Sequence, residues 1–354
     1  MDHRSDGSDL EKCHNANCIS YQIKETLIRM SFEIPKETNP GRITEVTIGA
    51  TSKEGGSRAF TVTVGGSTVL PYHFFEGRIP HCPRVAMEVF DQAPAKLSDA
   101  LLDYFADVIN HPAEMAEKCV REFGAELISV RLEGTHPEKG NKSAEEAAEV
   151  VRAVLRSVDV PIIITGHSHF GKNNEVMKKV CEAAAGENCL INYVEKDNYK
   201  TIAASCIVYR HCLVAQSPID VNLAKQLNIL LKDMNFPSEK IVMDPLTSAL
   251  GYGLEYTFSI MERIRNEGLA GDPMLACPIL VNPGYECARV KESFALSRDY
   301  PEWGDEKKRG LFWELTTAMS YLAAGADLLI LYHPKAVEVV KAKISKMFEF
   351  RSGE

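Results

Sequence analysis

The sequence predicts a (β/α)8 barrel, the TIM-barrel class of α/β fold, with an N-terminal β-hairpin extension. From about residue 81 onward, eight short apolar runs alternate with longer segments of helical period. These runs are apolar almost throughout, which is typical of parallel strands buried on both faces. Eight alternations over roughly 265 residues favour a closed barrel. An open doubly wound sheet is the weaker alternative, and no Gly-x-Gly-x-x-Gly motif follows the first run to support a dinucleotide site.

Each expected strand is followed by a segment that reads as a helix. The intervening stretches, such as PAEMAEKCVREFGAE and SAEEAAEVVRAVLRSV, carry apolar residues at three- and four-residue spacing. We expect the eight strands at residues 84–90, 127–132, 161–166, 188–194, 212–217, 240–244, 275–281 and 327–333.

The hairpin is predicted from two alternating runs ahead of the barrel, residues 43–50 and 59–66. Between them, Gly55-Gly56 can supply the positive φ angles that a tight turn requires. We therefore divide the chain into a polar, flexible tail (1–35), a hairpin with its connecting loop (36–80) and the barrel (81–348).

Charge and hydropathy narrow the functional classes. The 354 residues include 40 Lys and Arg against 49 Asp and Glu, a net charge of −9. Nucleic-acid binding needs a basic surface, so the balance argues against it and against an anionic membrane surface. No run of 18 apolar residues and no apolar signal segment is found. We expect a cytoplasmic protein with no nucleic-acid or membrane partner.

The ten cysteines fit reduced, buried thiols better than a disulfide framework, because most lie in apolar periodic segments. Cys13 and Cys18 form the nearest approach to a ligand pair, but no second pair follows at a zinc spacing. Free thiols in the tail are the favoured interpretation.

Ligands of a (β/α)8 barrel meet the loops that follow the carboxyl ends of the strands. The residues expected there are polar but chemically mild, with amides, glycines and few acids. They are Asp91, Arg131, Glu133, Gly166, His167, Ser168, His169, Asn192, Tyr193, Gln216, Ser217, Asp244, Pro245, Asn282, Pro283, Gly284, Tyr285, His333 and Pro334.

Three features of this ring invite a chemical interpretation. His167 and His169 could hold a metal, but they follow the third strand and lack companion ligands, so rim histidines are favoured. Arg131 could bind a phosphate or carboxylate, or pair with Glu133, and both remain open. Asp244 is expected to accept hydrogen bonds from loop amides rather than to move protons.

Several long stretches resemble the small (delta) subunit of the corrinoid iron–sulfur protein, which serves the acetyl-CoA decarbonylase/synthase complex and the reductive acetyl-CoA pathway. They include TIGATSKEGGSRAFTVTVGG, LPYHFFEGRIP, DNYKTIAASC, AQSPIDVNLAKQLNIL and IVMDPLTSALGYGLEYTFSIMERIR. The resemblance is collinear over about residues 42–345. The chain differs from the family's small-residue turn after the third strand, where it carries His167-Ser168-His169.

This resemblance implies a (β/α)8 barrel in a heterodimer with a large corrinoid iron–sulfur subunit. It implies a shared cobamide (vitamin B12 type), with the [4Fe-4S] cluster on the partner. The chain would be a non-catalytic cap in the transfer of a methyl group from methyltetrahydrofolate, via a methyltransferase, to acetyl-CoA synthase. Both that methyltransferase and CO dehydrogenase/acetyl-CoA synthase would bind transiently.

The residues expected to face the cobamide are Gly166, His167, His169, Asn192, Gln216, Asp244, Asn282 and Tyr285. We expect no catalytic and no metal-binding residue. The alternative function is a pterin-dependent methyltetrahydrofolate:corrinoid methyltransferase, with Asn192, Asp244 and Asn282 holding the pterin. A metal-dependent hydrolase using His167 and His169 is the least favoured hypothesis.

Overall fold

The computed structural model describes residues 34–94 and 96–349. The chain divides into two compact units, Met1–Glu37 and Thr38–Glu354. Residues 34–37 of the first unit form neither helix nor strand. The predicted tail, with Cys13 and Cys18, lies outside the described residues except for its last two positions.

Eight parallel strands form the barrel in the second unit, in the order β8-β7-β6-β5-β4-β3-β10-β9. A parallel bridge between Met243 and Ile279 links the two ends of this order, with the Met243 N–H donating to the Pro278 carbonyl at 2.8 Å. The strands are β3 (Arg84–Phe90), β4 (Ile128–Arg131), β5 (Ile162–Thr165), β6 (Leu190–Val194), β7 (Cys212–Gln216), β8 (Ile241–Asp244), β9 (Leu280–Val281) and β10 (Leu328–Leu331).

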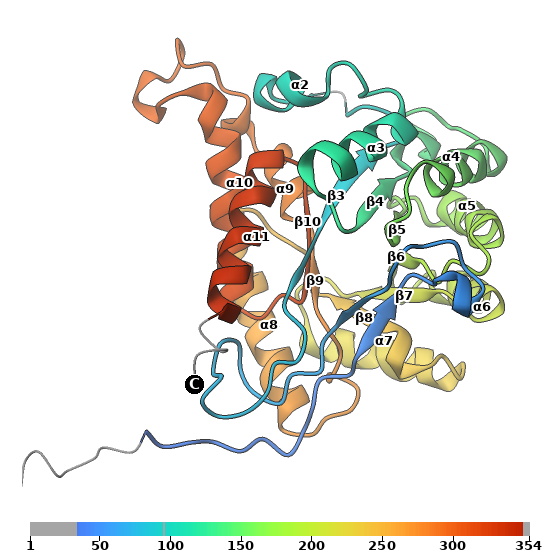
Figure 1. The fold of residues 1–354 in the computed structure, drawn as a ribbon, viewed down its shortest axis with the longest axis vertical. Helices are drawn as coiled ribbons and strands as arrows, with labels where there is room; N and C mark the ends of the chain where they lie inside the picture. Colours follow the sequence, from blue (N-terminus) through green and yellow to red (C-terminus); the bar gives the residue numbers. More distant parts are fainter. Residues whose placement is uncertain (1–33, 95, 350–354) are drawn as a thin grey trace, which may run out of the picture. The chain divides into compact units, whose positions relative to one another are not determined.

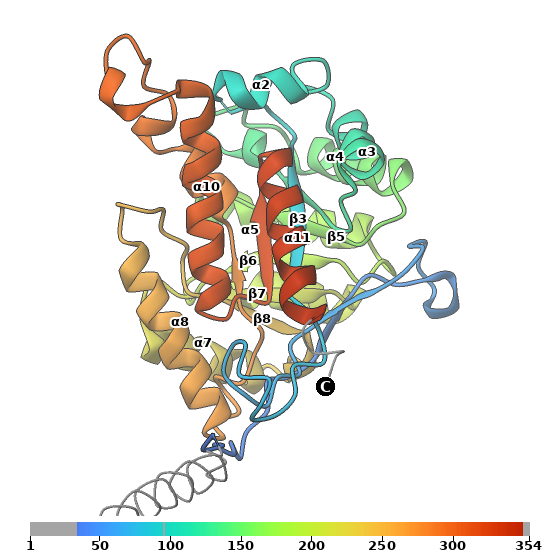
Figure 2. The same ribbon diagram turned by 60° about the vertical axis from the view of Figure 1, so that its left-hand side comes forward.

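Helices follow the strands and surround them, as Figure 1 shows, and α10 and α11 lie side by side in both Figure 1 and Figure 2. They are α2 (Asp99–Phe105), α3 (Pro112–Phe123), α4 (Ala144–Ser157), α5 (Phe170–Ala183), α6 (Tyr199–Tyr209), α7 (Val221–Asp233), α8 (Leu254–Leu269), α9 (Pro283–Ala288), α10 (Glu306–Ala323) and α11 (Pro334–Glu349). Helix starts follow local chemistry. At α4, for example, Ser143 and Glu146 form a capping box.

The predicted hairpin is confirmed as an antiparallel pair of β1 (Val46–Ile48) and β2 (Val62–Val64). Its four apolar side chains pack against a layer of apolar side chains inside the barrel. The hairpin therefore closes the end of the barrel at which the strands begin. That inner layer consists of Ala86, Leu127, Ile163, Leu190, Cys212, Val214, Val242, Leu280, Leu328 and Ile330. With one end closed by apolar packing, the polar chemistry of the barrel is confined to the opposite end.

The predicted (β/α)8 barrel is confirmed, and seven of its strands lie within two residues of the expected bounds at each end. The exception is the run 275–281, of which only Leu280–Val281 form a strand. Pro278 has no N–H to donate, and the Ala276 carbonyl accepts from the Thr44 N–H at 2.8 Å. The first part of the run therefore pairs with the segment before the hairpin.

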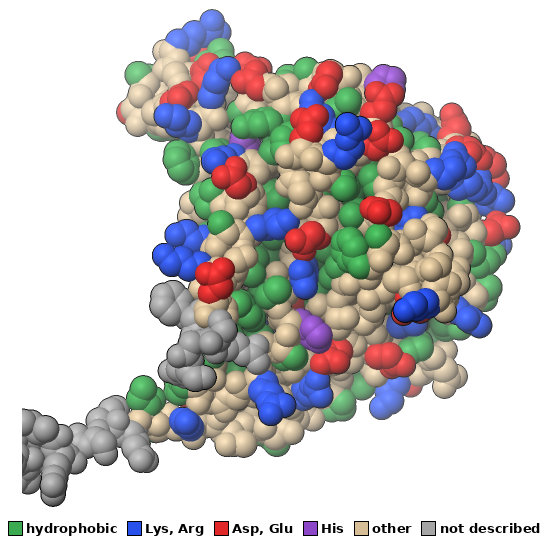
Figure 3. Space-filling view, viewed as in Figure 1, with side chains coloured by type: hydrophobic (Ala, Val, Ile, Leu, Met, Phe, Trp, Pro, Cys, Tyr) green, Lys and Arg blue, Asp and Glu red, His purple; other side chains and the backbone are tan. Residues whose placement is uncertain are grey.

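The surface carries charges of both signs. On the face drawn in Figure 3, Lys and Arg side chains are interspersed with Asp and Glu rather than gathered in a basic stripe. Across residues 34–94 and 96–349, no helix is both long enough and apolar enough to cross a membrane. The eight cysteines in these ranges are free thiols, seven of them buried.

Candidate functional site

A ring of polar side chains lies directly above the apolar inner layer. Side chains alternate in direction along a strand, so a residue two positions after an inward residue also points inward. Each barrel strand has such a residue two positions after a member of the apolar layer, and all eight are polar. They are Glu88, Ser129, Thr165, Asn192, Gln216, Asp244, Asn282 and Tyr332. The barrel interior thus changes from apolar to polar toward the carboxyl ends of the strands.

Glu88 on β3 is the centre of this ring, with an exposed fraction of only 1%. Its carboxylate accepts hydrogen bonds from Ser129 Oγ at 2.7 Å, Arg131 Nε at 2.5 Å and Tyr332 Oη at 2.8 Å. Asn282 Nδ2 lies 3.5 Å from the same group. The negative charge of Glu88 is therefore matched by Arg131.

The network continues from Ser129 to the next two strands. Ser129 Oγ lies 3.0 Å from Thr165 Oγ1, to which Asn192 Nδ2 donates at 3.1 Å. Hydrogen bonds thus connect β3, β4, β5 and β6, while Tyr332 and Asn282 connect the ring to β10 and β9. This continuity predicts a rigid mouth, because each side chain limits the rotation of its neighbour.

Arg131 follows the ring residue Ser129 by two positions on β4, so its side chain lies nearer the barrel mouth than the ring. It has two kinds of partner. Burial would lower the pKa of its guanidinium, but the Glu88 carboxylate, together with Tyr332 and Tyr285, outweighs burial and raises that pKa above its ordinary value. Its central carbon lies 3.8 Å from the centroid of the Tyr285 ring, a cation–π contact. Glu133 is more distant, with 3.6 Å between Arg131 Nη1 and Glu133 Oε2. Arg131 therefore pairs chiefly with Glu88, which was not the expected partner, and more distantly with the expected Glu133.

Gln216 and Asp244 form a pair on neighbouring strands. Gln216 Nε2 donates to Asp244 Oδ2 at 2.8 Å, and the Leu246 N–H donates to Asp244 Oδ1 at 2.8 Å. The expected acceptance of a loop amide by Asp244 is therefore confirmed. Burial raises the pKa of Asp244 to about 6, against the effect of both hydrogen bonds.

Asn282 and Gly166 each have a local structural role in addition to their position at the mouth. Asn282 Oδ1 caps α9 by accepting from the Tyr285 N–H at 3.0 Å. A Cβ at Gly166 would lie 2.2 Å from Asn173 Oδ1, so helix α5 can approach β5 only at a glycine. This close packing accounts for Gly166 without reference to a ligand.

His167 and His169 lie in a cluster with a third histidine, His136, from the loop after β4. The ring centroids of His136 and His167 are 5.1 Å apart, and those of His136 and His169 are 5.9 Å apart. Each Nδ1 accepts a backbone N–H, donated by Glu138, His169 and Lys172 to His136, His167 and His169 respectively. Each neutral ring therefore carries its proton on Nε2 and offers a donor there.

This tautomer is unsuited to metal binding, since a metal on Nε2 would displace the proton onto Nδ1, which is already an acceptor. No group of three or more His, Cys, Asp or Glu among residues 34–94 and 96–349 could hold a metal ion. Burial, with His136 nearby, lowers the pKa of His167 to about 4, so its ring is neutral at pH 7.

A cavity of about 600 Å³ opens beside the polar ring around Glu88, between the loops that follow β3, β4 and β9. Its charged and aromatic lining includes Arg131, Glu133, Lys139, Tyr285 and Arg289. Lys139 pairs with Glu133, and Arg289 lies 4.9 Å above the Tyr285 ring. The mouth therefore has room for a substantial ligand group beside an internally neutralised wall.

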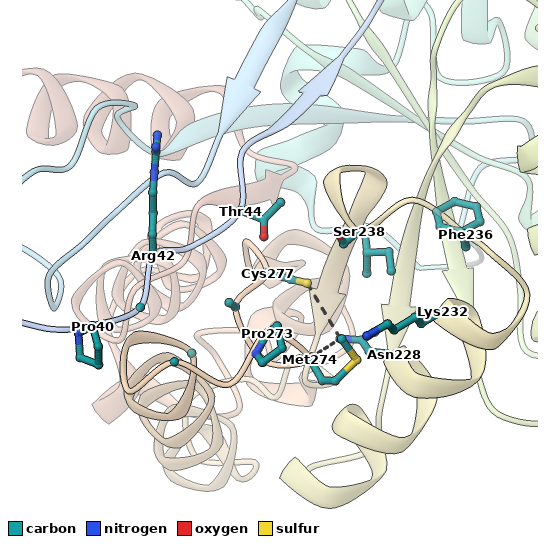
Figure 4. A pocket seen from close by; sticks show the side chains of 15 residues that line it. Pro40, Arg42, Thr44, Asn228, Lys232, Phe236, Ser238, Pro273, Met274 and Cys277 are labelled. Atoms are coloured by element: carbon teal, nitrogen blue, oxygen red, sulfur yellow. Dashed lines mark hydrogen bonds between the residues drawn. The ribbon is translucent and has the colours of Figure 1, made fainter.

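A second cavity of about 400 Å³ lies at the other end of the barrel, where Figure 4 shows side chains from α7 and the 273–277 segment around it. Asn228 lines it and donates to the Met274 carbonyl at 2.7 Å. Thr44, from the segment that leads into the hairpin, also lines this cavity. Because the closed apolar layer separates it from the polar ring, this cavity is distinct from the mouth.

Glu314 on α10 contacts the backbone at the carboxyl end of β10. Its carboxylate accepts the backbone N–H of Tyr332 at 2.7 Å and that of His333 at 3.2 Å, which orients the end of β10. Burial raises the pKa of Glu314 from the ordinary 4.5 to about 7, against both hydrogen bonds. The carboxyl group thus titrates near neutral pH at the base of the mouth.

Replacing Glu314 by glutamine is expected to flatten the pH dependence of stability. The folded state holds the Glu314 proton more tightly than the unfolded state does, so its contribution is full below about pH 4.5 and is lost as the pH rises through 7. From pH 4 to pH 8, the free energy of unfolding of the wild type should fall by about 3 kcal/mol more than that of Glu314→Gln. Urea denaturation at pH 4, 6 and 8 measures this, and parallel curves would refute it.

The predicted site residues thus fall into separate groups. Asn192 and Asn282 belong to the network around Glu88, Gln216 pairs with Asp244, and Tyr285 stacks on Arg131. Sequence reasoning missed Glu88, Tyr332, Glu314 and His136. A lone acid inside the apolar run RVAMEVF was the available signal for Glu88.

The family model and the related sequences that match this chain all describe the same kind of subunit. A family model described as the CO dehydrogenase/acetyl-CoA synthase delta subunit matches residues 45–341. The acetyl-CoA decarbonylase/synthase complex subunit delta of Archaeoglobus fulgidus is 40% identical over 326 residues, which cover 90% of this chain and 72% of that protein. The corresponding delta subunit of Methanocaldococcus jannaschii is 35% identical, over 92% of this chain and 78% of that one.

Solved structures with a similar fold are dihydropteroate synthases. The enzyme from Xanthomonas albilineans has a TM-score of 0.52 and 15% identity, covering 77% of this chain and 94% of its own. The enzyme from Yersinia pestis has a TM-score of 0.53 and 15% identity, covering 77% of this chain and 95% of its own. At this level of identity the likeness establishes the barrel fold alone.

Proposed function

Since the chain belongs to the family of CO dehydrogenase/acetyl-CoA synthase delta subunits, we propose that it is a non-catalytic subunit that caps a cobamide held by a larger partner subunit. The partner would carry the [4Fe-4S] cluster and most of the cobamide-binding surface. The cobamide supplies the cobalt that accepts and releases the methyl group. This chain would cover the cobamide, exclude water and orient its periphery.

The observation that carries the proposal is the chemical character of the mouth. Glu88 is paired with Arg131, and each oxygen of Asp244 accepts a hydrogen bond from a neighbouring group, so both carboxylates already have structural partners. The neutral groups His167, Asn192 and Ser217 each carry a buried polar atom without a partner. Such a surface suits a large, hydrogen-bonding, uncharged periphery better than a reacting substrate.

The unpartnered polar atoms of His167, Asn192 and Ser217 could hydrogen-bond to the periphery of a cobamide, so these residues fit that group. We propose that Gly166, His167, His169, Asn192, Gln216, Asp244, Asn282 and Tyr285 face it, as all lie at the carboxyl ends of barrel strands. The methyl group would come from methyltetrahydrofolate through a separate methyltransferase and pass to acetyl-CoA synthase. Both enzymes would therefore be transient partners of the heterodimer.

A pterin-dependent methyltransferase is the second candidate, favoured by the amide and carboxylate groups of Asn192, Asp244 and Asn282 at the carboxyl ends of β6, β8 and β9. A pterin edge could bind such groups. Against it, Gln216 and Leu246 already donate to the two oxygens of Asp244, so a pterin would have to share this carboxylate with them.

Co-expression with a corrinoid iron–sulfur large subunit tests the proposal. We expect a heterodimer on gel filtration that shows cobamide absorption, and no tight binding of methyltetrahydrofolate by this chain alone. A chain that stays monomeric beside every such subunit contradicts the proposal. A chain that binds methyltetrahydrofolate tightly by itself favours the pterin enzyme.

A further inference from the structure

The cavity at the amino-terminal end of the barrel is lined by a buried side chain with an unmatched polar atom. Asn228 on α7 lines this cavity of about 400 Å³ and has an exposed fraction of only 2%. Its Nδ2 donates to the Met274 carbonyl at 2.7 Å, whereas its Oδ1 has no partner among the described residues. Buried polar atoms are nearly always hydrogen-bonded, so Oδ1 requires a donor that the described chain does not supply.

A cation lies on the same face of α7 as Asn228. Lys232 follows Asn228 by four positions, which makes the two side chains neighbours on the helix surface. Lys232 also lines the cavity, and Figure 4 shows it beside Asn228. Within residues 34–94 and 96–349, no carboxylate pairs with its ammonium group. The other cation of the lining, Arg42, is already paired with Glu45. Lys232 therefore leaves a positive charge available to a ligand.

No lining side chain opposes an anion in this cavity. Among the described residues that line it, none is Asp or Glu. Burial raises the pKa of the lining thiol, Cys277, to about 12, so this thiol is uncharged at pH 7. Asp272, just ahead of the lining segment, is matched by Lys225 at 2.6 Å. A ligand with one negative charge would therefore gain from Lys232 and meet no acid in the lining.

Apolar side chains supply much of the remaining wall. Phe236, Ile241 and Met274 line the cavity, and Phe236 has an exposed fraction of 4%. The volume lies within the range of about 300–1,000 Å³ that is typical of small-molecule sites. Such sites combine an apolar wall with a few polar groups that fix the orientation of the ligand. In this cavity those groups are Asn228 and Lys232.

We propose that this cavity binds a small organic anion that has an apolar body and an O–H or N–H donor. Its negative group would pair with Lys232, its donor would meet Asn228 Oδ1, and its body would pack against Phe236 and Met274. A bare inorganic anion has no apolar body to bury against this wall. The site lies at the opposite end of the barrel from the mouth, so the inference does not depend on the proposed function.

Titration of the full ¹⁵N-labelled chain with 4-hydroxyphenylacetate, followed by NMR, tests the cavity directly. This probe combines a carboxylate, an aromatic ring and an O–H donor. We expect the Asn228 Nδ2–H2 signals and the Gly271 backbone amide to shift until they saturate. The side-chain amides of Asn192 and Gln216, at the mouth, should stay in place. A titration that leaves Asn228 unchanged, or that shifts only the mouth, overturns the inference.

Two analogues test the two polar contacts separately. 4-Methoxyphenylacetate cannot donate to Asn228 Oδ1 and should bind about five- to tenfold more weakly than the hydroxyl compound. 4-Hydroxyphenylacetamide keeps the donor but lacks the negative charge, and should bind about three- to fivefold more weakly. Equal affinity of all three compounds overturns the inference and leaves a water molecule as the partner of Asn228.

Lys232→Met tests the cation in the chain itself. Lys232 is exposed, so the variant should fold as the wild type does. It should bind 4-hydroxyphenylacetate about three- to fivefold more weakly and 4-hydroxyphenylacetamide equally well. Lys178→Met is the matched control, because Lys178 is an exposed lysine of α5 that does not line the cavity. Equal binding of the carboxylate by the two variants overturns the inference and leaves the proposed function standing.

Discussion

Replacing Glu88 by alanine is expected to lower the free energy of unfolding by about 3–5 kcal/mol, because the buried Arg131 guanidinium loses its closest counter-charge. Ser129 and Tyr332 lose their acceptor in the same change. Arg131, with an exposed fraction of 7%, would then keep only the more distant carboxylate of Glu133, at 3.6 Å. Urea denaturation of wild type and variant at pH 7 measures the difference.

Two further variants separate loss of charge pairing from loss of packing. The double variant Glu88→Met/Arg131→Met removes both charges and should recover much of the lost stability, since a buried pair replaced by apolar groups is often neutral. Glu126→Ala breaks pairs with Arg84 and Lys341 in which all the side chains are partly exposed, and should cost about 1 kcal/mol. If Glu88→Ala cost no more than Glu126→Ala, the view of Glu88 as the centre of the mouth would be wrong.

Replacing Arg58 by methionine is expected to release the hairpin from the amino-terminal end of the barrel. The Arg58 guanidinium donates to the carbonyls of Val158 at 2.6 Å and Leu155 at 2.7 Å, and to Glu187 Oε2 at 2.9 Å. Its side chain has an exposed fraction of 1%. Leaving the two carbonyls without this donor and the Glu187 carboxylate without its counter-charge should cost about 3–5 kcal/mol.

Hydrogen exchange distinguishes this local release from general destabilisation. In Arg58→Met, the amides of β1 and β2 should exchange faster than those of β4 and β5. Arg42→Met is the control, because it removes only an exposed pair with Glu45 and one 3.3 Å hydrogen bond to the Gly66 carbonyl, so exchange should change little. Equal acceleration across hairpin and barrel would show that Arg58 acts on the fold as a whole.

The barrel could be predicted because its strands are buried on both faces and so appear as continuous apolar runs. The run RVAMEVF, for example, coincides with β3. The short β9 could not be predicted, since the pairing of Ala276 with Thr44 joins segments more than two hundred residues apart. Apolar composition reports burial and does not report which neighbour supplies the hydrogen bonds.

The site was predictable where polar residues end a strand and was missed where they lie inside one. Asn192, Gln216 and Asp244 were found by the strand-end rule, whereas Glu88 lies within β3. Counting two positions from each inner apolar residue would have found Glu88, Ser129 and Thr165. His136 could not have been placed beside His167 in this way, because only the folded loops bring the two together.

The most direct test of the proposed cap is the absorption spectrum of a cobamide-loaded large subunit during titration with this chain. We expect the cobalt bands to change, with saturation at one chain per large subunit, and the change to be smaller for the double variant His167→Gly/His169→Gly. A spectrum that stays constant at equimolar chain, with the two proteins eluting separately on gel filtration, would contradict the role as a corrinoid cap.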